Sequence, residues 1–161
     1  VPEASAATGS LQRECSDDGR VPEIAAQRRL HAAVLEAFRA RLISSLDGRR
    51  PALAQLEAAG VPFHRVEILK ATSESVYFLS SEGLREAEWS MIPPGQVAAL
   101  AHAAGLLEPR DLFALGLLCH YAGLPEDARR FLLRLEGTSF SVVARGLLAP
   151  PSAGDGIERA P

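Results

Sequence analysis

Residues 108–137 read EPRDLFALGLLCHYAGLPEDARRFLLRLEG. Small and apolar residues recur in this stretch at the three- and four-residue spacing that puts side chains on one face of a helix. They are Leu112, Leu115, Gly116 and Cys119 in the first half, and Ala128, Leu132 and Leu135 in the second. The pattern predicts two short amphipathic helices, joined at residues 122–125 as an antiparallel hairpin.

The expected ends of both helices carry the appropriate residues. Pro109 and Pro125 stand where a first helical turn tolerates a missing N–H. Gly137 fits a left-handed cap after the second helix. The small residues Gly116 and Ala128 would let the two backbones approach closely.

This hairpin, residues 109–142, resembles one tetratricopeptide (TPR) repeat, a helix-turn-helix unit of about 34 residues. With Pro109 opening the repeat, the signature positions hold Leu112, Leu115, Gly116, Cys119, Gly123, Ala128, Leu132 and Leu135. The sequence departs from the pattern with a Leu for the usual aromatic in each helix, a Leu for the later small residue, and Phe140 in place of the closing Pro. No second copy is visible. Because such units are stable when stacked, the resemblance implies that the hairpin packs on another part of the chain or on a partner.

Composition is that of one soluble domain. The chain has 161 residues, 47% of them apolar and 23% charged, with a net charge of −3. That length buries a core without disulfides or metals. Lys70 is the single lysine, and the abundance of Arg, Ala, Leu, Gly and Pro suggests a high-GC bacterial source. The chain begins at Val1 rather than Met, so we expect it to be part of a longer protein.

The two cysteines predict no metal site. Cys15 and Cys119 are far apart, and no CxxC or Cys/His spacing accompanies them. We expect a reducing, cytoplasmic environment, no cofactor and no metal. No charge-free apolar run near 18 residues predicts a membrane span, and a signal peptide is not visible.

Helices are predicted on both sides of a short β-region. We interpret residues 1–20 as a flexible linker and 150–161 as a tail. An apolar stripe from Ile24 to Leu46 predicts a long helix over 22–47. Pro51, with Leu53, Leu56 and Gly60, predicts a short helix over 51–59. The remaining predicted helices span 94–107, 109–122, 125–136 and 139–148.

Residues 63–92 predict three short strands, 63–70, 75–80 and 84–92, in an antiparallel meander. On the third strand Ala87, Trp89 and Met91 share one face, which we expect to be dry. A Trp side chain buries on the order of 200 Å², so we expect Trp89 to be the structural pin between meander and helices. The predicted fold is α+β and mostly helical, in one domain over 21–149. Its three-stranded meander lies between the long N-terminal helix and the C-terminal hairpin.

Catalytic signatures are not visible in the sequence. His31, His64, His102 and His120 form no i, i+4 metal-site pair. Cys119 and His120 are neighbours on a helix, so their side chains do not face each other. Glu86 and Glu88 share one strand face, which is either a solvated face or an acidic strip for a basic partner. The paired arginines are scattered, which argues against nucleic acid.

We therefore expect a non-catalytic protein-interaction or regulatory domain of a larger bacterial protein. The order of elements is similar to accessory regions of large modular signalling proteins of high-GC bacteria. The expected partner is a protein or a second copy. It would bind an apolar surface of Leu112, Phe113, Leu117 and Tyr121, or the free edge of the meander. One alternative is a small ligand-binding or enzymatic domain whose pocket, between meander and helices, contains His64, His102 or Glu88. A structural spacer is another.

Overall fold

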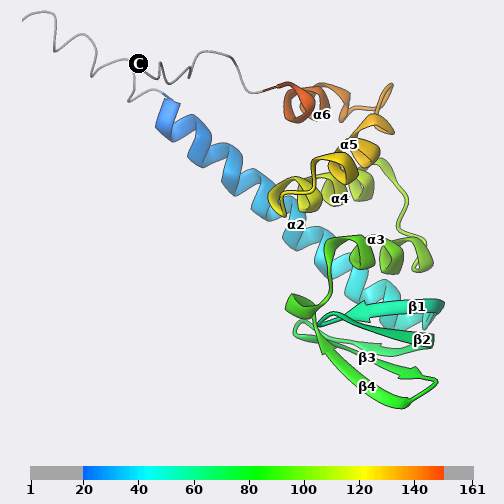
Figure 1. Ribbon diagram of the computed structural model, residues 1–161. Coiled ribbons are helices and arrows are strands. Elements are labelled where there is room, and N and C mark those ends of the chain that lie inside the picture. The colour runs from blue at the N-terminus through cyan, green and yellow to red at the C-terminus, as the bar shows by residue number, and fades with distance from the viewer. Residues whose placement is uncertain (1–19, 151–161) are drawn as a thin grey trace, which may run out of the picture. The chain divides into compact units, whose positions relative to one another are not determined.

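The computed structural model describes residues 20–150. The predicted linker and tail, apart from Arg20 and Pro150, lie outside these residues. Figure 1 shows the order of the described elements. They are α2 (Arg20–Arg49), β1 (Ala52–Ala58), β2 (Val61–Ala71), β3 (Ser75–Ser80), β4 (Gly83–Glu88), the 3-10 turn η1 (Trp89–Met91), α3 (Pro94–Ala103), α4 (Pro109–Tyr121), α5 (Pro125–Leu133) and α6 (Ser141–Leu148).

The chain divides into two compact units after Ala37, within α2. The first unit, as far as it is described, is the first half of α2, and its apolar side chains Val21, Ile24 and Leu30 are exposed. The second unit holds the rest of α2, the sheet and all later helices. The predicted helix over 22–47 is present and extends by two residues at each end.

The sheet corrects the predicted fold class. The described residues form a four-stranded antiparallel sheet in the order β1-β2-β3-β4, so the predicted three-stranded meander is wrong, although the α+β class stands. The extra strand is β1, which occupies the place of the predicted helix over 51–59. Pairing of Leu53 with Val66 and of Leu56 with Phe63 holds it in the sheet.

The β1–β2 turn explains why these residues form a strand. Ala58 pairs with Val61, and the two residues between them, Ala59 and Gly60, have φ angles of 52° and 75°. Two successive positive φ values are typical of the type I′ turn, whose twist matches that of a two-stranded ribbon. The turn joins β1 to the longer strand β2, and that pairing overrides the helical propensity of an Ala-rich segment.

The inner face of the sheet contributes buried side chains to the core of the second unit. Val76 and Phe78 on β3 pair with Ala71 and Ile68 on β2, and all four side chains are buried. The outer face carries polar and exposed residues, including Tyr77, Leu79 and Glu86. One dry and one wet face are usual for an antiparallel sheet. The second half of α2 adds Phe38, Leu42 and Leu46 to the core of the second unit.

Trp89 does not lie on the third predicted strand. β4 ends at Glu88, and Trp89 begins η1. Its ring is half-buried, and Nε1 donates a hydrogen bond of 2.8 Å to the carbonyl oxygen of Thr72. Of its expected dry-face neighbours, Ala87 is buried but Met91 is 49% exposed.

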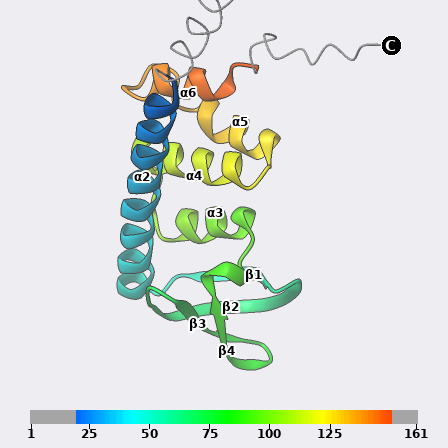
Figure 2. The same cartoon turned by 90° about the vertical axis from the view of Figure 1, so that its left-hand side faces the viewer.

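The later helices stack beside the sheet in chain order. Figures 1 and 2 show α3 next to the sheet and α4, α5 and α6 progressively farther from it. The helices α4 and α5 pack on each other as the predicted hairpin, with Gly116 directly against Leu132. Membership of the TPR family stays a prediction.

Candidate functional site

The predicted apolar surface on α4 is mostly interior. Leu112, Phe113 and Leu117 are 6%, 4% and 0% exposed, whereas Tyr121 is 52% exposed. The ring of Phe113 stacks on that of Phe140 at a centroid distance of 5.3 Å. The four residues therefore do not form one accessible surface, and only Tyr121, at the end of α4, is open to a partner.

An apolar groove lies instead between α5 and α6. Its volume is about 480 Å³. The residues that line it are His120, Pro125, Glu126, Ala128, Arg129, Leu132, Leu133, Leu147, Leu148 and Ala149. Charged and polar groups are few and stand on α5 and the end of α4, so hydrophobic contact is the main interaction that the groove offers.

Exposed apolar side chains extend the groove beyond its lining. Leu133 on its wall is 51% exposed, and Leu124, next to Pro125, is 36% exposed. Val143 stands one helical turn before Leu147 on α6 and is 44% exposed. Because the wall itself is this open, the groove is a surface feature and not an enclosed cavity.

The local sequence explains how the groove forms. Pro125 at the start of α5, followed by Glu126 and Asp127, favours a helix that begins there. Thr138 donates to the carbonyl oxygen of Leu135 at 2.7 Å and accepts from the N–H of Phe140 at 3.2 Å. These bonds form the connection that brings α6 back onto α5.

The thiol beside the groove is not an activated nucleophile. Cys119 is fully buried, and desolvation, with a smaller contribution from the Asp127 carboxylate, raises the pKa of its thiol. The neighbouring His120 is exposed, and its ring meets that of Tyr121 edge to face at 5.3 Å. His120, which lines the groove, therefore gives it a polar rim at the end of α4.

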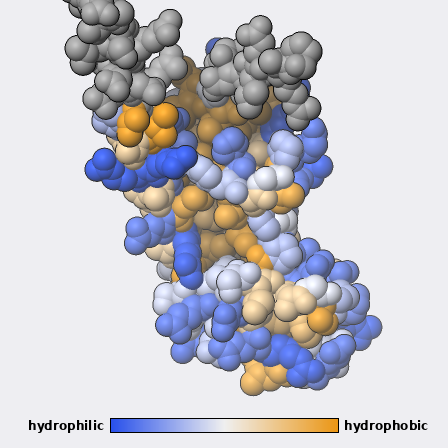
Figure 3. All heavy atoms as spheres, turned by 60° about the vertical axis from the view of Figure 1, so that its left-hand side comes forward, coloured by the Kyte–Doolittle hydropathy of each residue, from blue (hydrophilic) through white to orange (hydrophobic). Residues whose placement is uncertain are grey.

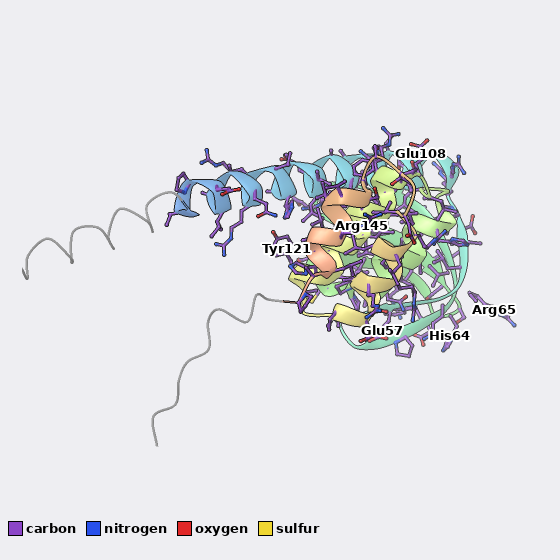
Figure 4. The ribbon with its side chains drawn as sticks, turned by 90° about the horizontal axis from the view of Figure 1, so that it is seen from above. Glu57, His64, Arg65, Glu108, Tyr121 and Arg145 are labelled. Atoms are coloured by element: carbon purple, nitrogen blue, oxygen red, sulfur yellow. The ribbon has the colours of Figure 1, made fainter. Side chains whose placement is uncertain are left out.

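The structure does not assemble the alternative site between sheet and helices. His64 pairs with Gln55 on β1, whereas Glu88 pairs with Ser75 at the other end of the sheet. His64, His102 and Glu88 are all exposed. Figure 4 shows His64 and Arg65 apart from Tyr121 and Arg145. Among residues 20–150 no group of three or more His, Cys, Asp or Glu is placed to hold a metal ion.

Within the same residues, no helix is both long and apolar enough to cross a membrane. Comparison with known proteins found no matching protein family, no matching curated protein and no matching solved structure.

Sequence reasoning missed the groove for a clear reason. Its walls come from two successive helices, α5 and α6, whose packing on each other the sequence pattern does not give. Leu133 lies outside the apolar stripe predicted for α5, and Val143 reads as an ordinary apolar residue of a short helix. The usable signal was the surplus of apolar residues in α6, which has Val142, Val143, Leu147 and Leu148 in eight residues.

Proposed function

We propose that this chain is a non-catalytic protein-interaction domain, and that the groove between α5 and α6 binds an amphipathic helix. The observation that carries the proposal is the open apolar groove, with Leu133 exposed on its α5 wall and Val143 exposed on α6, one helical turn before the lining residue Leu147. Exposed contiguous apolar surface on a soluble protein is typical of interaction sites.

A helix suits this groove better than a small molecule does. Small-molecule sites bury most of the ligand surface, but this groove is open and Leu133 on its wall is itself 51% exposed, so a small apolar ligand would remain partly in water. A partner helix with apolar residues at positions i, i+3, i+4 and i+7 would cover both walls at once. The helix belongs either to another protein or to a second copy.

The remaining parts of the proposal follow from composition. A net charge of −3 with scattered arginines supports a protein partner over nucleic acid. The absence of paired cysteine motifs supports a reducing, cytoplasmic environment. The abundance of Arg, Ala, Leu, Gly and Pro supports a high-GC bacterial source, and the order of elements supports an accessory region of a larger signalling protein.

The test uses the full 161-residue chain and a phage-displayed library of helical peptides. The L133R/V143R double variant, altered only at exposed positions, serves for counter-selection. Leu107→Arg, at a position 41% exposed outside the groove, is the matched control. We expect selected peptides to carry a helical apolar stripe and to bind L133R/V143R at least tenfold more weakly than the parent and Leu107→Arg.

Sedimentation of the parent up to about 1 mM tests the self-associating version. A dimer that L133R/V143R abolishes, with unchanged circular dichroism, supports the proposal. A strictly monomeric chain from which no groove-dependent helical peptide is selected would refute it.

A further inference from the structure

The two edge strands of the sheet, β1 and β4, differ in whether their outward-facing backbone groups have hydrogen-bond partners. At β1, the N–H of Glu57 donates to Oε1 of Gln96 at 3.2 Å, and the N–H of Ala59, just after the strand, donates to the carbonyl oxygen of Met91 at 2.8 Å. Residues 91–96 thus occupy the hydrogen-bonding positions at this end of β1. In residues 20–150, no equivalent segment bonds to the outer edge of β4.

The pairing of β4 with β3 identifies which backbone groups face outward. The N–H of Trp89 donates to the carbonyl oxygen of Glu74 at 3.1 Å. In an antiparallel ladder hydrogen-bonded pairs alternate with non-hydrogen-bonded pairs. The pairs Glu88–Ser75, Glu86–Tyr77 and Leu84–Leu79 are therefore of the second type. The N–H and C=O groups of Leu84, Glu86 and Glu88 consequently point away from β3.

These three residues also share the outer face of the sheet. They are separated by two positions each, and all three are exposed, Leu84 by 63%. Leu79, opposite Leu84, is 43% exposed. Figure 3 shows hydrophobic residues among hydrophilic ones at this lower end of the molecule. The outward-facing edge therefore presents one apolar and two acidic side chains in a row.

This charge pattern disfavours a second copy at the same edge. An antiparallel pair of β4 strands centred on Glu86 would place the two Glu86 carboxylates opposite each other. Like charges directly opposite on a sheet are destabilising, whereas opposite charges stabilise. The β4 edge should therefore pair less favourably with the β4 edge of a second copy than with a basic strand.

We propose that the β4 edge binds one extended, basic segment of a partner protein by strand addition. In an antiparallel arrangement the segment places Lys or Arg opposite Glu88 and Glu86 and an apolar residue opposite Leu84. The backbone hydrogen bonds supply the attachment, and the alternate side chains supply the specificity. The site is separate from the groove between α5 and α6 and does not depend on it.

The probe is a blocked synthetic peptide of sequence Ser-Thr-Lys-Val-Lys-Val-Leu-Thr-Ser, titrated into the full chain. Hydrogen exchange of the backbone amides, followed by NMR, is the readout. We expect the amides of Leu84, Glu86 and Glu88 to gain protection on binding. Those of Arg85 and Ala87, which face β3, serve as internal controls because the sheet already protects them. A peptide with Glu in place of both Lys should not bind.

Two variants separate strand addition from general charge attraction. E86K/E88K should weaken binding at least about tenfold. E126K/E136K changes the net charge equally at two exposed positions on and just after α5, outside the sheet, and should bind as the parent does. A peptide methylated at its backbone nitrogens keeps its charge and should lose binding. Unchanged protection of the Leu84, Glu86 and Glu88 amides, or equal weakening by both double variants, would overturn the proposal.

Discussion

The guanidinium of Arg41 on α2 donates two hydrogen bonds to one carboxylate oxygen of Asp111 on α4, at 2.8 Å from Nη2 and 3.2 Å from Nε. Asp111 is 1% exposed, and its other oxygen accepts the N–H of Glu108 at 3.2 Å. The same carboxylate thus caps α4 and joins it to α2. This one buried acid therefore links the start of α4 to the second half of α2.

Arg41→Ala should destabilise the fold by about 2–3 kcal/mol. The change leaves the Asp111 carboxylate buried without its cation, and the effect is reduced because 27% of the Arg41 side chain is accessible. Urea unfolding followed by circular dichroism measures it. Arg130→Ala, which breaks an exposed pair at 3.7 Å with Asp127, is the control and should cost much less. Equal losses in both variants would contradict the role assigned to Asp111.

Gly116→Ala should destabilise the hairpin although Ala is the better helix former. A Cβ at position 116 would lie 2.5 Å from Cδ2 and 2.7 Å from Cγ of Leu132, which is itself buried. Overpacking of this kind destabilises a fold by about 1–3 kcal/mol. The higher helix propensity of Ala relative to Gly offsets about 0.5–1 kcal/mol of that loss. Denaturant unfolding should therefore show a net loss of about 1–2 kcal/mol.

Gly146→Ala on α6 is the matched control for that substitution. No atom lies within 4 Å of a Cβ placed there, so propensity alone should stabilise the chain by up to about 1 kcal/mol. A G116A/L132A double variant tests the clash directly, since removal of the Leu132 side chain should make Gly116→Ala harmless in that background. Persistence of the G116A penalty would place its cause elsewhere.

Trp89→Ala should cost about 2–3 kcal/mol. Full burial of a Trp would make the loss larger, but this ring is half-buried and stands on η1. Trp89→Phe removes mainly the hydrogen bond to Thr72 and should cost about 1 kcal/mol. Circular dichroism is the appropriate probe, because Trp89 is the single tryptophan and fluorescence is lost in both variants. A loss as large for Phe as for Ala would show that the ring contributes little packing.

The pKa of the Tyr77 hydroxyl should be higher than that of an ordinary tyrosine. Its hydrogen bond to the Glu86 carboxylate, together with the charge of that carboxylate, raises the pKa of its hydroxyl. The protonated hydroxyl is therefore favoured in the fold, and this contribution, fully present below the unfolded pKa near 10, is lost as the pH rises through the folded pKa.

Ultraviolet absorbance of tyrosinate measures this titration. Glu86→Gln should return the pKa of Tyr77 toward its ordinary value, and Glu88→Gln should leave it raised. Tyr121, the other tyrosine, is removed by Tyr121→Phe so that one hydroxyl is observed. If the pKa of Tyr77 stays as high in the Glu86→Gln variant as in the parent, the contact between the Tyr77 and Glu86 side chains across β3 and β4 is contradicted.

Ala59→Asn should stabilise the β1–β2 turn by about 0.5–1 kcal/mol. A residue with a Cβ is strained at φ 52°, and Asn tolerates this conformation best among non-glycine residues. Thermal unfolding checks the gain. Asn at the neighbouring Ala58, which is buried and extended in β1, should instead be destabilising.

The same turn shows where prediction from the sequence failed. Asn-Gly is the usual signature of a type I′ turn, but Ala59-Gly60 reads as the end of a helix. Leu53 and Leu56 are three residues apart, a spacing that suggests one face of a helix. In the strand this spacing goes with an irregularity in the pairing: Ala54 and the opposite residue Arg65 are unpaired, and Arg65 has a φ of 52°. Strand pairing, which depends on distant residues, decided the outcome.

The helices could be predicted because their signals are local. Pro109 and Pro125 begin α4 and α5 as expected, and Gly123 and Gly137 adopt positive φ after them. The surface could not be predicted, because α4 is apolar on several sides. Such a helix is either buried all round or offered to a partner, and the burial of Leu112, Phe113 and Leu117 resolves this in favour of the core.

The covered end of β1 has a consequence for how many molecules can join the sheet. A ribbon open at both borders can elongate without limit, which is how fibrils grow. Here the bonds of Glu57 and Ala59 to residues 91–96 cover one end of the β1 border. Under the strand addition proposed for β4, partner strands are then expected to join the sheet at β4 and not at the covered end of β1, which disfavours growth of the sheet in both directions.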